Sequence, residues 1–165
     1  GYWQVPMDED SKSYTAFSTP DGALYQFVVM PFGLKGAPAT FQRLMTHEVL
    51  SGLLHDCVKV YLDDILVYSR DIQEHTKHLG LVFERLRLHQ LRISPDKCKF
   101  ATRSLDYLGH RIDEDVIVPQ QKHIHGINHF PEPKTKRQLQ SFLGTINWIR
   151  EYLPDVAKLT QPLVK

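Results

Sequence analysis

The chain has 165 residues, of which 42% are hydrophobic and 24% are charged, with 20 Lys/Arg, 19 Asp/Glu and 2 Cys. This composition excludes intrinsic disorder, collagen and coiled coil, and the length allows a sizeable core. No stretch approaches the ~20 apolar residues that span a bilayer, and no leader opens the chain, so we expect neither a membrane segment nor secretion. Cys57 and Cys98 lack a partner motif, which argues against a disulfide scaffold or a zinc site and for a reducing compartment.

The charges are distributed unevenly along the chain. Residues 1–115 carry 13 Lys/Arg against 16 Asp/Glu, a net of −3, whereas residues 116–165 carry 7 against 3, a net of +4. An acidic body with a basic C-terminal segment suggests a metal or catalytic centre in the first and a polyanion contact in the second. On charge alone, a solvated helical surface is the simpler interpretation.

The N-terminal third of the sequence predicts a hairpin followed by a loop and a helix. Residues 13–18 and 24–30 are rich in β-forming side chains and flank a Thr-Pro-Asp-Gly turn, so they predict two paired strands. Residues 31–38 hold two glycines and two prolines and predict a loop. Helical spacing of apolar residues then predicts a helix over residues 39–54.

The middle of the sequence predicts a second hairpin and a long helix. Residues 58–62 and 65–68 are short β-rich runs that enclose Asp63-Asp64, which places this acidic pair at the tip of the hairpin. An amphipathic pattern predicts a helix over residues 71–90. Short strands are then expected around residues 98–101, 105–112 and 116–118.

The C-terminal segment predicts only helices. Residues 120–129 and 135–152 have helical patterns, a Phe-Pro-Glu-Pro break separates them, and a last short helix begins at Val156. The order is therefore mixed β and α up to about residue 118 and all α afterwards, which suggests an α+β fold followed by a helical module.

Asp63 and Asp64 are adjacent carboxylates between apolar strands, where they repel each other and resist desolvation. A divalent cation is one reason for a fold to place them there, because Mg²⁺ takes carboxylate oxygens and leaves positions for substrate phosphates. By itself, however, the dipeptide favours an exposed turn, since Asp is a common turn residue.

The sequence around this dipeptide indicates a particular family. Tyr61-Leu62-Asp63-Asp64, flanked by Val-Lys-Val and Ile-Leu-Val, resembles the YxDD motif of reverse transcriptases. The whole chain is similar to the reverse transcriptase of gypsy-class LTR retrotransposons, which is related to that of retroviruses. Phe32, where retroviral enzymes usually carry Gln, supports the gypsy class. Further family motifs follow in order: MPFGLKGAPATFQ from Met30, Glu74-His75 with His78-Leu79, KCKF from Lys97, YLGHRI from Tyr107, Phe142-Leu143-Gly144, and Pro162-Leu163.

The resemblance implies an α+β right-hand polymerase, with a palm of antiparallel sheet plus helices, part of the fingers and a helical thumb. Residues 1–36 would be the end of the first palm strand and the second half of the fingers. Residues 37–118 would be the palm with the YLDD and primer-grip hairpins, and residues 119–165 the thumb. The implied activity is RNA-directed DNA synthesis, with Asp63 a ligand to two Mg²⁺ ions (Mn²⁺ is the alternative) and Asp64 a supporting ligand.

The resemblance also implies nucleotide-binding roles for Tyr2, Phe32 and Gly33. The Tyr2 ring would pack under the incoming sugar and exclude a 2′-hydroxyl, which would clash or lose its hydration without a partner. Gly33 lacks a Cβ, so the backbone can approach a nucleotide or template closely. The alternatives are a core Tyr2 and a plain loop-to-helix turn.

Primer contact is implied for Leu108, Gly109 and His110, which match the hairpin that grips the primer end. Gly109 would allow the strand to approach closely, although a structural β-turn explains the same residues.

Template–primer contact is also implied for the helix that begins near Thr135. Gln140, Gly144 and Trp148 recur at i, i+4 and i+8 on one face and match the helix that lies along the minor groove of the duplex. Lys136 and Arg137 could meet phosphates and give salt-dependent affinity. Core packing of Trp148 is the alternative.

The expected partners are an RNA or DNA template–primer duplex, deoxynucleoside triphosphates and, in a parent Pol polyprotein, RNase H, integrase and protease modules. The family places its first catalytic Asp before the position of Gly1, so we expect a reverse transcriptase fragment that is inactive by itself. A domesticated or degenerate remnant that binds nucleic acid or protein without catalysis is the alternative. The expected location is the cytoplasm, within a virus-like particle, or the nucleus.

Overall fold

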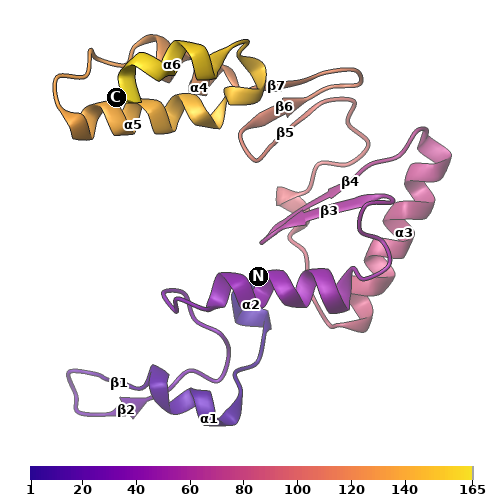
Figure 1. The fold of residues 1–165 in the computed structure, drawn as a ribbon. Coiled ribbons are helices and arrows are strands. Elements are labelled where there is room, and N and C mark those ends of the chain that lie inside the picture. The colour runs from indigo at the N-terminus through magenta and orange to yellow at the C-terminus, as the bar shows by residue number, and fades with distance from the viewer. Residues whose placement is uncertain (165) are drawn as a thin grey trace. The chain divides into compact units, whose positions relative to one another are not determined.

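The computed structural model describes residues 1–164 and divides the chain into two compact units (Figure 1). The N-terminal unit comprises Gly1–Ala101, and the C-terminal unit begins at Thr102. Helices and antiparallel strands occur in both units, which confirms the α+β expectation. None of the helices within residues 1–164 is long and apolar enough to cross a membrane.

The first hairpin is shorter than the sequence predicts. The strands β1 (Phe17–Ser18) and β2 (Leu24–Tyr25) pair antiparallel, after a short helix α1 (Glu9–Lys12). Ser13–Thr15 forms a 3₁₀ turn instead of a strand, because the Thr15 hydroxyl donates to the Lys12 carbonyl at 2.6 Å. Beyond β2, the amide of Met30 donates to the carbonyl of Val5 at 2.9 Å, so this segment pairs with the chain start.

The helix predicted over residues 39–54 begins two residues earlier and changes type. It consists of α2 (Ala37–Arg43) and a π-helical continuation, Leu44–Val49. The Leu50 amide donates to the Met45 carbonyl at 2.9 Å, which closes the wide turn and ends the helix. Its apolar face contributes Ala37, Phe41, Met45 and Val49 to the core of the N-terminal unit, where they join buried Met30, Leu50, Cys57, Val58, Val82 and Leu86.

The central hairpin and the long helix confirm the sequence predictions. Strands β3 (Val58–Tyr61) and β4 (Asp64–Val67) pair antiparallel with Val58 opposite Val67 and Tyr61 opposite Asp64. Helix α3 (Ile72–Leu88) lies beside this hairpin and contacts β4 (Figure 1). It buries Val82 and Leu86.

Polar contacts connect β4 to α3. Asp71 caps the helix by accepting from the Glu74 amide at 2.8 Å, and the Glu74 carboxylate accepts from the Arg70 amide at 2.8 Å. The hydroxyl of Ser69 lies 2.7 Å from Nδ1 of His78 and 3.2 Å from Nδ1 of His75. The far end of the hairpin is therefore fixed to the longest helix of the unit.

The C-terminal unit combines a small sheet with helices. Its sheet is formed by β5 (Leu105–Tyr107), β6 (His110–Ile112) and β7 (Ile117–Pro119), and its helices are α4 (Gln121–Asn128), α5 (Lys136–Trp148) and α6 (Val156–Val164). Residues 105–112 form two strands around a tight turn, not one strand, and residues 98–101 form none. Thr135 and Gln138 form a capping box that starts α5.

Candidate functional site

The turn between β3 and β4 presents two adjacent carboxylates at the end of a hairpin. Leu62 and Asp63 form the turn, and Asp64 is the first residue of β4. The Asp63 side chain is 53% exposed, so it is accessible to an ion or a ligand. Within residues 1–164, no group of three His, Cys, Asp or Glu side chains is arranged to hold a metal ion.

The side-chain amide of Gln42, on α2, holds this turn in place. Its Oε1 accepts from the backbone amide of Leu62 at 2.6 Å, and its Nε2 donates to the carbonyl of Val60 at 3.2 Å. Leu62 has a φ of +52°, which an L residue adopts at a cost and which therefore needs support from its surroundings. Gln42 has no predicted role from the sequence, where it is the last residue of the MPFGLKGAPATFQ motif. The available signal was a polar residue between the apolar positions Phe41 and Leu44.

The start of the chain lies beside Asp63. The Gly1 nitrogen is 3.3 Å from Oδ1 of Asp63. A Cβ at Gly1 would collide with that carboxylate and would come within 2.7 Å of Cζ of Phe41, so only glycine fits this position without rearrangement.

Aromatic rings cluster around Tyr2, the residue that follows Gly1. The ring of Tyr2 lies 5.3 Å from that of Phe32 and 5.4 Å from that of buried Phe41. Phe32 is 66% exposed and also contacts Trp3, whose ring is 5.8 Å away. The structure thus brings Tyr2 and Phe32 together, and through Gly1 and Phe41 it connects them to Asp63.

Gly33 follows this aromatic cluster. Its φ is +93°, and nothing lies within 4 Å of the position that its Cβ would occupy. The backbone conformation therefore favours glycine here, and the space beside it is open.

In the C-terminal unit, Leu108 and Gly109 form the turn between β5 and β6. Their φ angles are +47° and +86°, and the Gly109 carbonyl accepts from the Gln120 amide at 3.0 Å. A Cβ on Gly109 would come within 2.6 Å of Cζ2 of Trp148. The Trp148 indole thus occupies the space that a side chain at position 109 would need, so packing within the protein itself requires glycine here.

Trp148 and His110 have contacts within the same unit. The indole is 39% exposed and lies 4.9 Å from the ring of His110. Nδ1 of His110 is 2.9 Å from the hydroxyl of Tyr152. Burial and the neighbouring Glu151 carboxylate raise the pKa of the Tyr152 hydroxyl.

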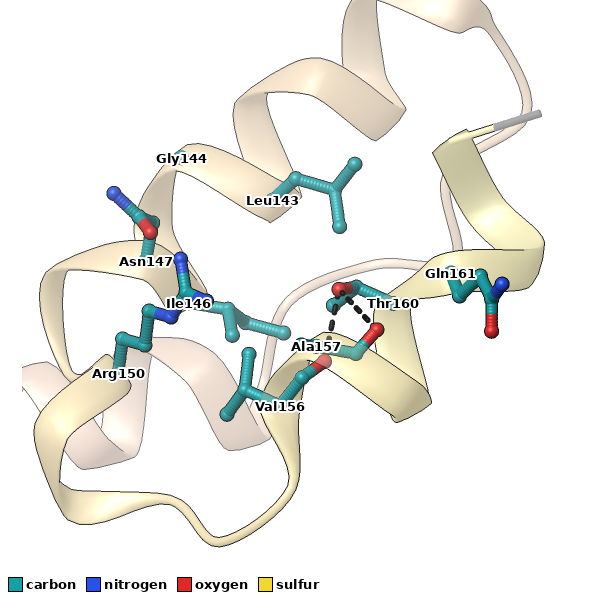
Figure 2. A pocket seen from close by; sticks show the side chains of 9 residues that line it. All are labelled: Leu143, Gly144, Ile146, Asn147, Arg150, Val156, Ala157, Thr160 and Gln161. Carbon is teal, nitrogen blue, oxygen red and sulfur yellow. Dashed lines mark hydrogen bonds between the residues drawn. The ribbon is translucent and has the colours of Figure 1, made fainter.

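Gly144 opens onto a pocket between α5 and α6 (Figure 2). The pocket has a volume of about 690 Å³, and nothing lies within 4 Å of the position of a Gly144 Cβ. Its lining mixes apolar and polar side chains: Leu143, Ile146, Val156 and Ala157 with Asn147, Arg150, Thr160 and Gln161. Exposed Gln140, Lys136 and Arg137 also lie on α5.

The hairpin turn held by Gln42, with its pair of carboxylates and the aromatic rings near Gly1, is the candidate site of the N-terminal unit. Comparison with known proteins gives the family. The family described as "Reverse transcriptase (RNA-dependent DNA polymerase)" matches residues 1–112, and the chain belongs to this family. The resemblance drawn from the sequence motifs is confirmed.

The relatives are long polyproteins. The chain is 39% identical over 163 residues to the retrovirus-related Pol polyprotein from transposon 297 of Drosophila melanogaster, covering 99% of the chain and 15% of the polyprotein. It is 37% identical over 164 residues to the enzymatic polyprotein of Cauliflower mosaic virus (strain NY8153), covering 99% of the chain and 24% of the polyprotein. The chain therefore spans less than a quarter of the first of these relatives and about a quarter of the second.

Solved structures confirm the right-hand polymerase fold. The chain matches the foamy viral protease-reverse transcriptase dRH in complex with double-stranded DNA, with a TM-score of 0.86 and 27% identity over 99% of the chain and 28% of that protein. It also matches the foamy viral protease-reverse transcriptase in complex with an RNA/DNA hybrid, with a TM-score of 0.76 and 27% identity over 99% of the chain and 22% of that protein.

Replacing Gln42 by Met should destabilise the N-terminal unit. The variant keeps the volume of the side chain but leaves the Leu62 amide and the Val60 carbonyl without this partner, so we expect a loss of about 1–3 kcal/mol in unfolding free energy. Urea unfolding followed by circular dichroism measures it. Gln73→Met on the exposed face of α3 is the matched control, and equal stability of the two variants would contradict the clamp.

Replacing Gly109 by Ala should destabilise the C-terminal unit. The new Cβ meets the Trp148 indole and must adopt a left-handed backbone conformation, which together should cost about 1–3 kcal/mol. Gly126→Ala in α4 adds a Cβ in open space and should instead be neutral or stabilising. A Gly109→Ala chain with an unchanged melting temperature would refute the packing of the turn against Trp148.

Proposed function

We propose that this chain is the core of an RNA-directed DNA polymerase that joins a deoxynucleotide to a primer 3′-hydroxyl. The observation that carries the proposal is the hairpin turn clamped by Gln42, which presents Asp63 next to Gly1, and the following residue, Tyr2, contacts Phe32. Catalysis of this kind depends on fixed charges where the phosphoryl group reacts, and a turn that is held by two hydrogen bonds supplies a fixed carboxylate.

Reverse transcriptases use divalent metal ions, and the donor set at this turn fits Mg²⁺, or Mn²⁺ as the alternative. Asp63 and Asp64 would hold the ion, because Mg²⁺ is commonly bound by one or two carboxylates together with water and substrate phosphates. When bound, the ion supplies charge that stabilises the attacking and leaving oxygens. The protein's own contribution is to keep both carboxylates at one end of a rigid hairpin, since the Gln42 amide fixes the turn.

Tyr2, Phe32 and Gly33 are the proposed nucleotide contacts. The Tyr2 ring lies between exposed Phe32 and buried Phe41, which limits its movement and makes it a rigid surface for a sugar ring. A 2′-hydroxyl against this surface would lose water without gaining a hydrogen bond, so a deoxynucleotide is the preferred substrate. The open space beside Gly33 leaves room for the nucleotide or template.

Primer contact is proposed at the Leu108–Gly109–His110 turn, and duplex contact along the α5 face with Gln140, Gly144 and Trp148. The open space above Gly144 supports a close approach of this helix to a groove. Lys136 and Arg137 at the start of α5 would contact phosphates, and the partner would be an RNA or DNA template–primer duplex. The foamy viral proteins of similar fold are complexed with double-stranded DNA and with an RNA/DNA hybrid.

The proposed functional regions are residues 1–36 for the end of the first palm strand and the second half of the fingers, 37–118 for the palm and 119–165 for the thumb. In a Pol polyprotein the chain would work beside RNase H, integrase and protease modules, in a virus-like particle or the nucleus. A non-catalytic remnant that binds nucleic acid is the second candidate. The observation that favours it is that, within the described residues, no third His, Cys, Asp or Glu side chain joins Asp63 and Asp64 in a group that could hold a metal ion.

The purified 165-residue chain should give no primer extension with Mg²⁺ or Mn²⁺. Two-metal phosphoryl transfer needs carboxylates on both sides of the ion pair, and Asp63 and Asp64 provide one side. A gel assay with a labelled primer and all four deoxynucleotides measures this. Extension that disappears in Asp63→Asn would show that the chain is a complete catalyst.

In a polymerase that contains this chain and is active, Asp63→Asn should remove nearly all turnover and leave template–primer affinity largely intact. The Asp63 carboxylate would act in the chemical step, whereas duplex binding consists mostly of contacts to the sugar-phosphate backbone of the nucleic acid. Single-turnover extension and anisotropy with a labelled duplex separate the two effects. Asp96→Asn, at an exposed position away from the turn, is the control, and substantial turnover by the Asp63 variant would exclude Asp63 as a ligand.

Replacing Lys136 and Arg137 by Ala should weaken duplex binding equally across sequences. Each lost phosphate contact should lower the slope of log affinity against log salt by about one unit or less. Lys77→Ala on α3 is the control and should leave the slope unchanged.

Gly144→Val should instead shorten the DNA products, because a side chain in that open space would hold α5 away from the duplex. Normal product lengths at low temperature in a destabilised Gly144→Val enzyme would refute this contact.

A further inference from the structure

Trp148, in the last turn of α5, contacts a second imidazole besides that of His110. The ring of His123, on α4, lies 4.4 Å from the indole at an interplanar angle of 34°. Neither the sequence motifs nor the proposed function gives His123 a role. The two other histidines of this segment stack on each other, with the rings of His125 and His129 3.9 Å apart, so His123 alone among the α4 histidines contacts Trp148.

His123 and Trp148 meet at the Leu108–Gly109 turn. A Cβ on Gly109 would come within 2.6 Å of Cζ2 of Trp148 and within 3.2 Å of Nε2 of His123, so both rings cover the same glycine. The backbone adds a connection at this point. The Gln120 amide donates to the Gly109 carbonyl at 3.0 Å, and the His123 amide donates to the Gln120 carbonyl at 2.9 Å.

We infer that His123 is a positioning residue that holds the Trp148 indole against Gly109 and thereby fixes the Leu108–Gly109 turn that would contact the primer. The inference rests on the primer contact in the proposed function. Both turn residues have left-handed φ angles, and the non-glycine residue Leu108 keeps such a conformation only where its surroundings maintain it. The indole provides that support on one side of Gly109, and His123 restricts the movement of the indole.

The contact itself can be tested in the 165-residue chain by fluorescence. The chain has two tryptophans, so Trp3→Phe leaves Trp148 as the single emitter. The emission maximum of an indole moves to longer wavelength when water replaces a packed neighbour, so the emission of Trp148 reports on its contact with His123. The groups that face the indole or its partner are His123 and His110, with Tyr152 and Glu151 beside His110.

In the Trp3→Phe chain, His123→Ala should move the Trp148 emission maximum to longer wavelength, because water replaces the imidazole, and His123→Phe should restore it. His125→Ala, on the same helix but stacked on His129, is the matched control and should leave the emission unchanged. An emission maximum that is the same with and without the His123 ring would overturn the contact and the inference.

The positioning role is tested in a longer Pol protein that contains this chain. His123→Ala should raise the KM for template–primer about two- to tenfold, the range that follows from losing one aromatic pair, with a smaller change in kcat and in the KM for nucleotide. His123→Phe should restore the KM, because it keeps the ring. Unchanged KM in His123→Ala, or equal failure of both variants at a temperature where both are folded, would overturn the inference. The wild-type enzyme separates the two proposals, since absence of primer extension there refutes the proposed function itself.

Discussion

The two hydrogen bonds of the Gln42 amide are the contacts on which the carboxylate site depends. They join α2 to a hairpin 18 to 20 residues further along the chain and hold Leu62 in a left-handed conformation. With Leu62 fixed, Asp63 faces Gly1 and Asp64 begins β4 opposite Tyr61. The remaining core supports this arrangement, because Phe41 lies next to Gln42 on the buried face of α2 and also contacts the ring of Tyr2.

The C-terminal unit uses one residue for two purposes. Trp148 is half-exposed on the face of α5 proposed to meet the duplex, yet its ring also fills the space above Gly109 and contacts His110. Core packing and ligand contact, which the sequence left as alternatives for this residue, are compatible in the structure. A ring that is held by the fold and still reaches solvent offers a surface whose orientation is already fixed, which lowers the entropy cost of binding.

Local patterns predicted most of the helices and strands, whereas the roles of Gln42 and Trp148 depend on long-range contacts. The helix predicted over residues 71–90 is α3, Ile72–Leu88, because its apolar period is a local pattern; the structure adds the Asp71 cap at its start. The strand predicted at Ser13–Thr15 was wrong. The hydrogen bond from the Thr15 hydroxyl to the Lys12 carbonyl stabilises a 3₁₀ turn there despite the β propensity of these residues. The motif predicted Asp63 and Asp64 as the candidate site, but the role of Gln42 and the fit of Trp148 over Gly109 depend on segments far apart in sequence.

The central claim is that a turn held by Gln42 places Asp63 and Asp64 together at a metal-dependent polymerase site. The most direct measurement is the anomalous scattering of Mn²⁺ in crystals of a polymerase containing this chain, bound to template–primer and a deoxynucleoside triphosphate. The account predicts a manganese peak in direct contact with carboxylate oxygens of Asp63, with Asp64 alongside and both Gln42 hydrogen bonds intact. Manganese bound elsewhere, or an Asp63 carboxylate turned away from the nucleotide phosphates, would contradict it.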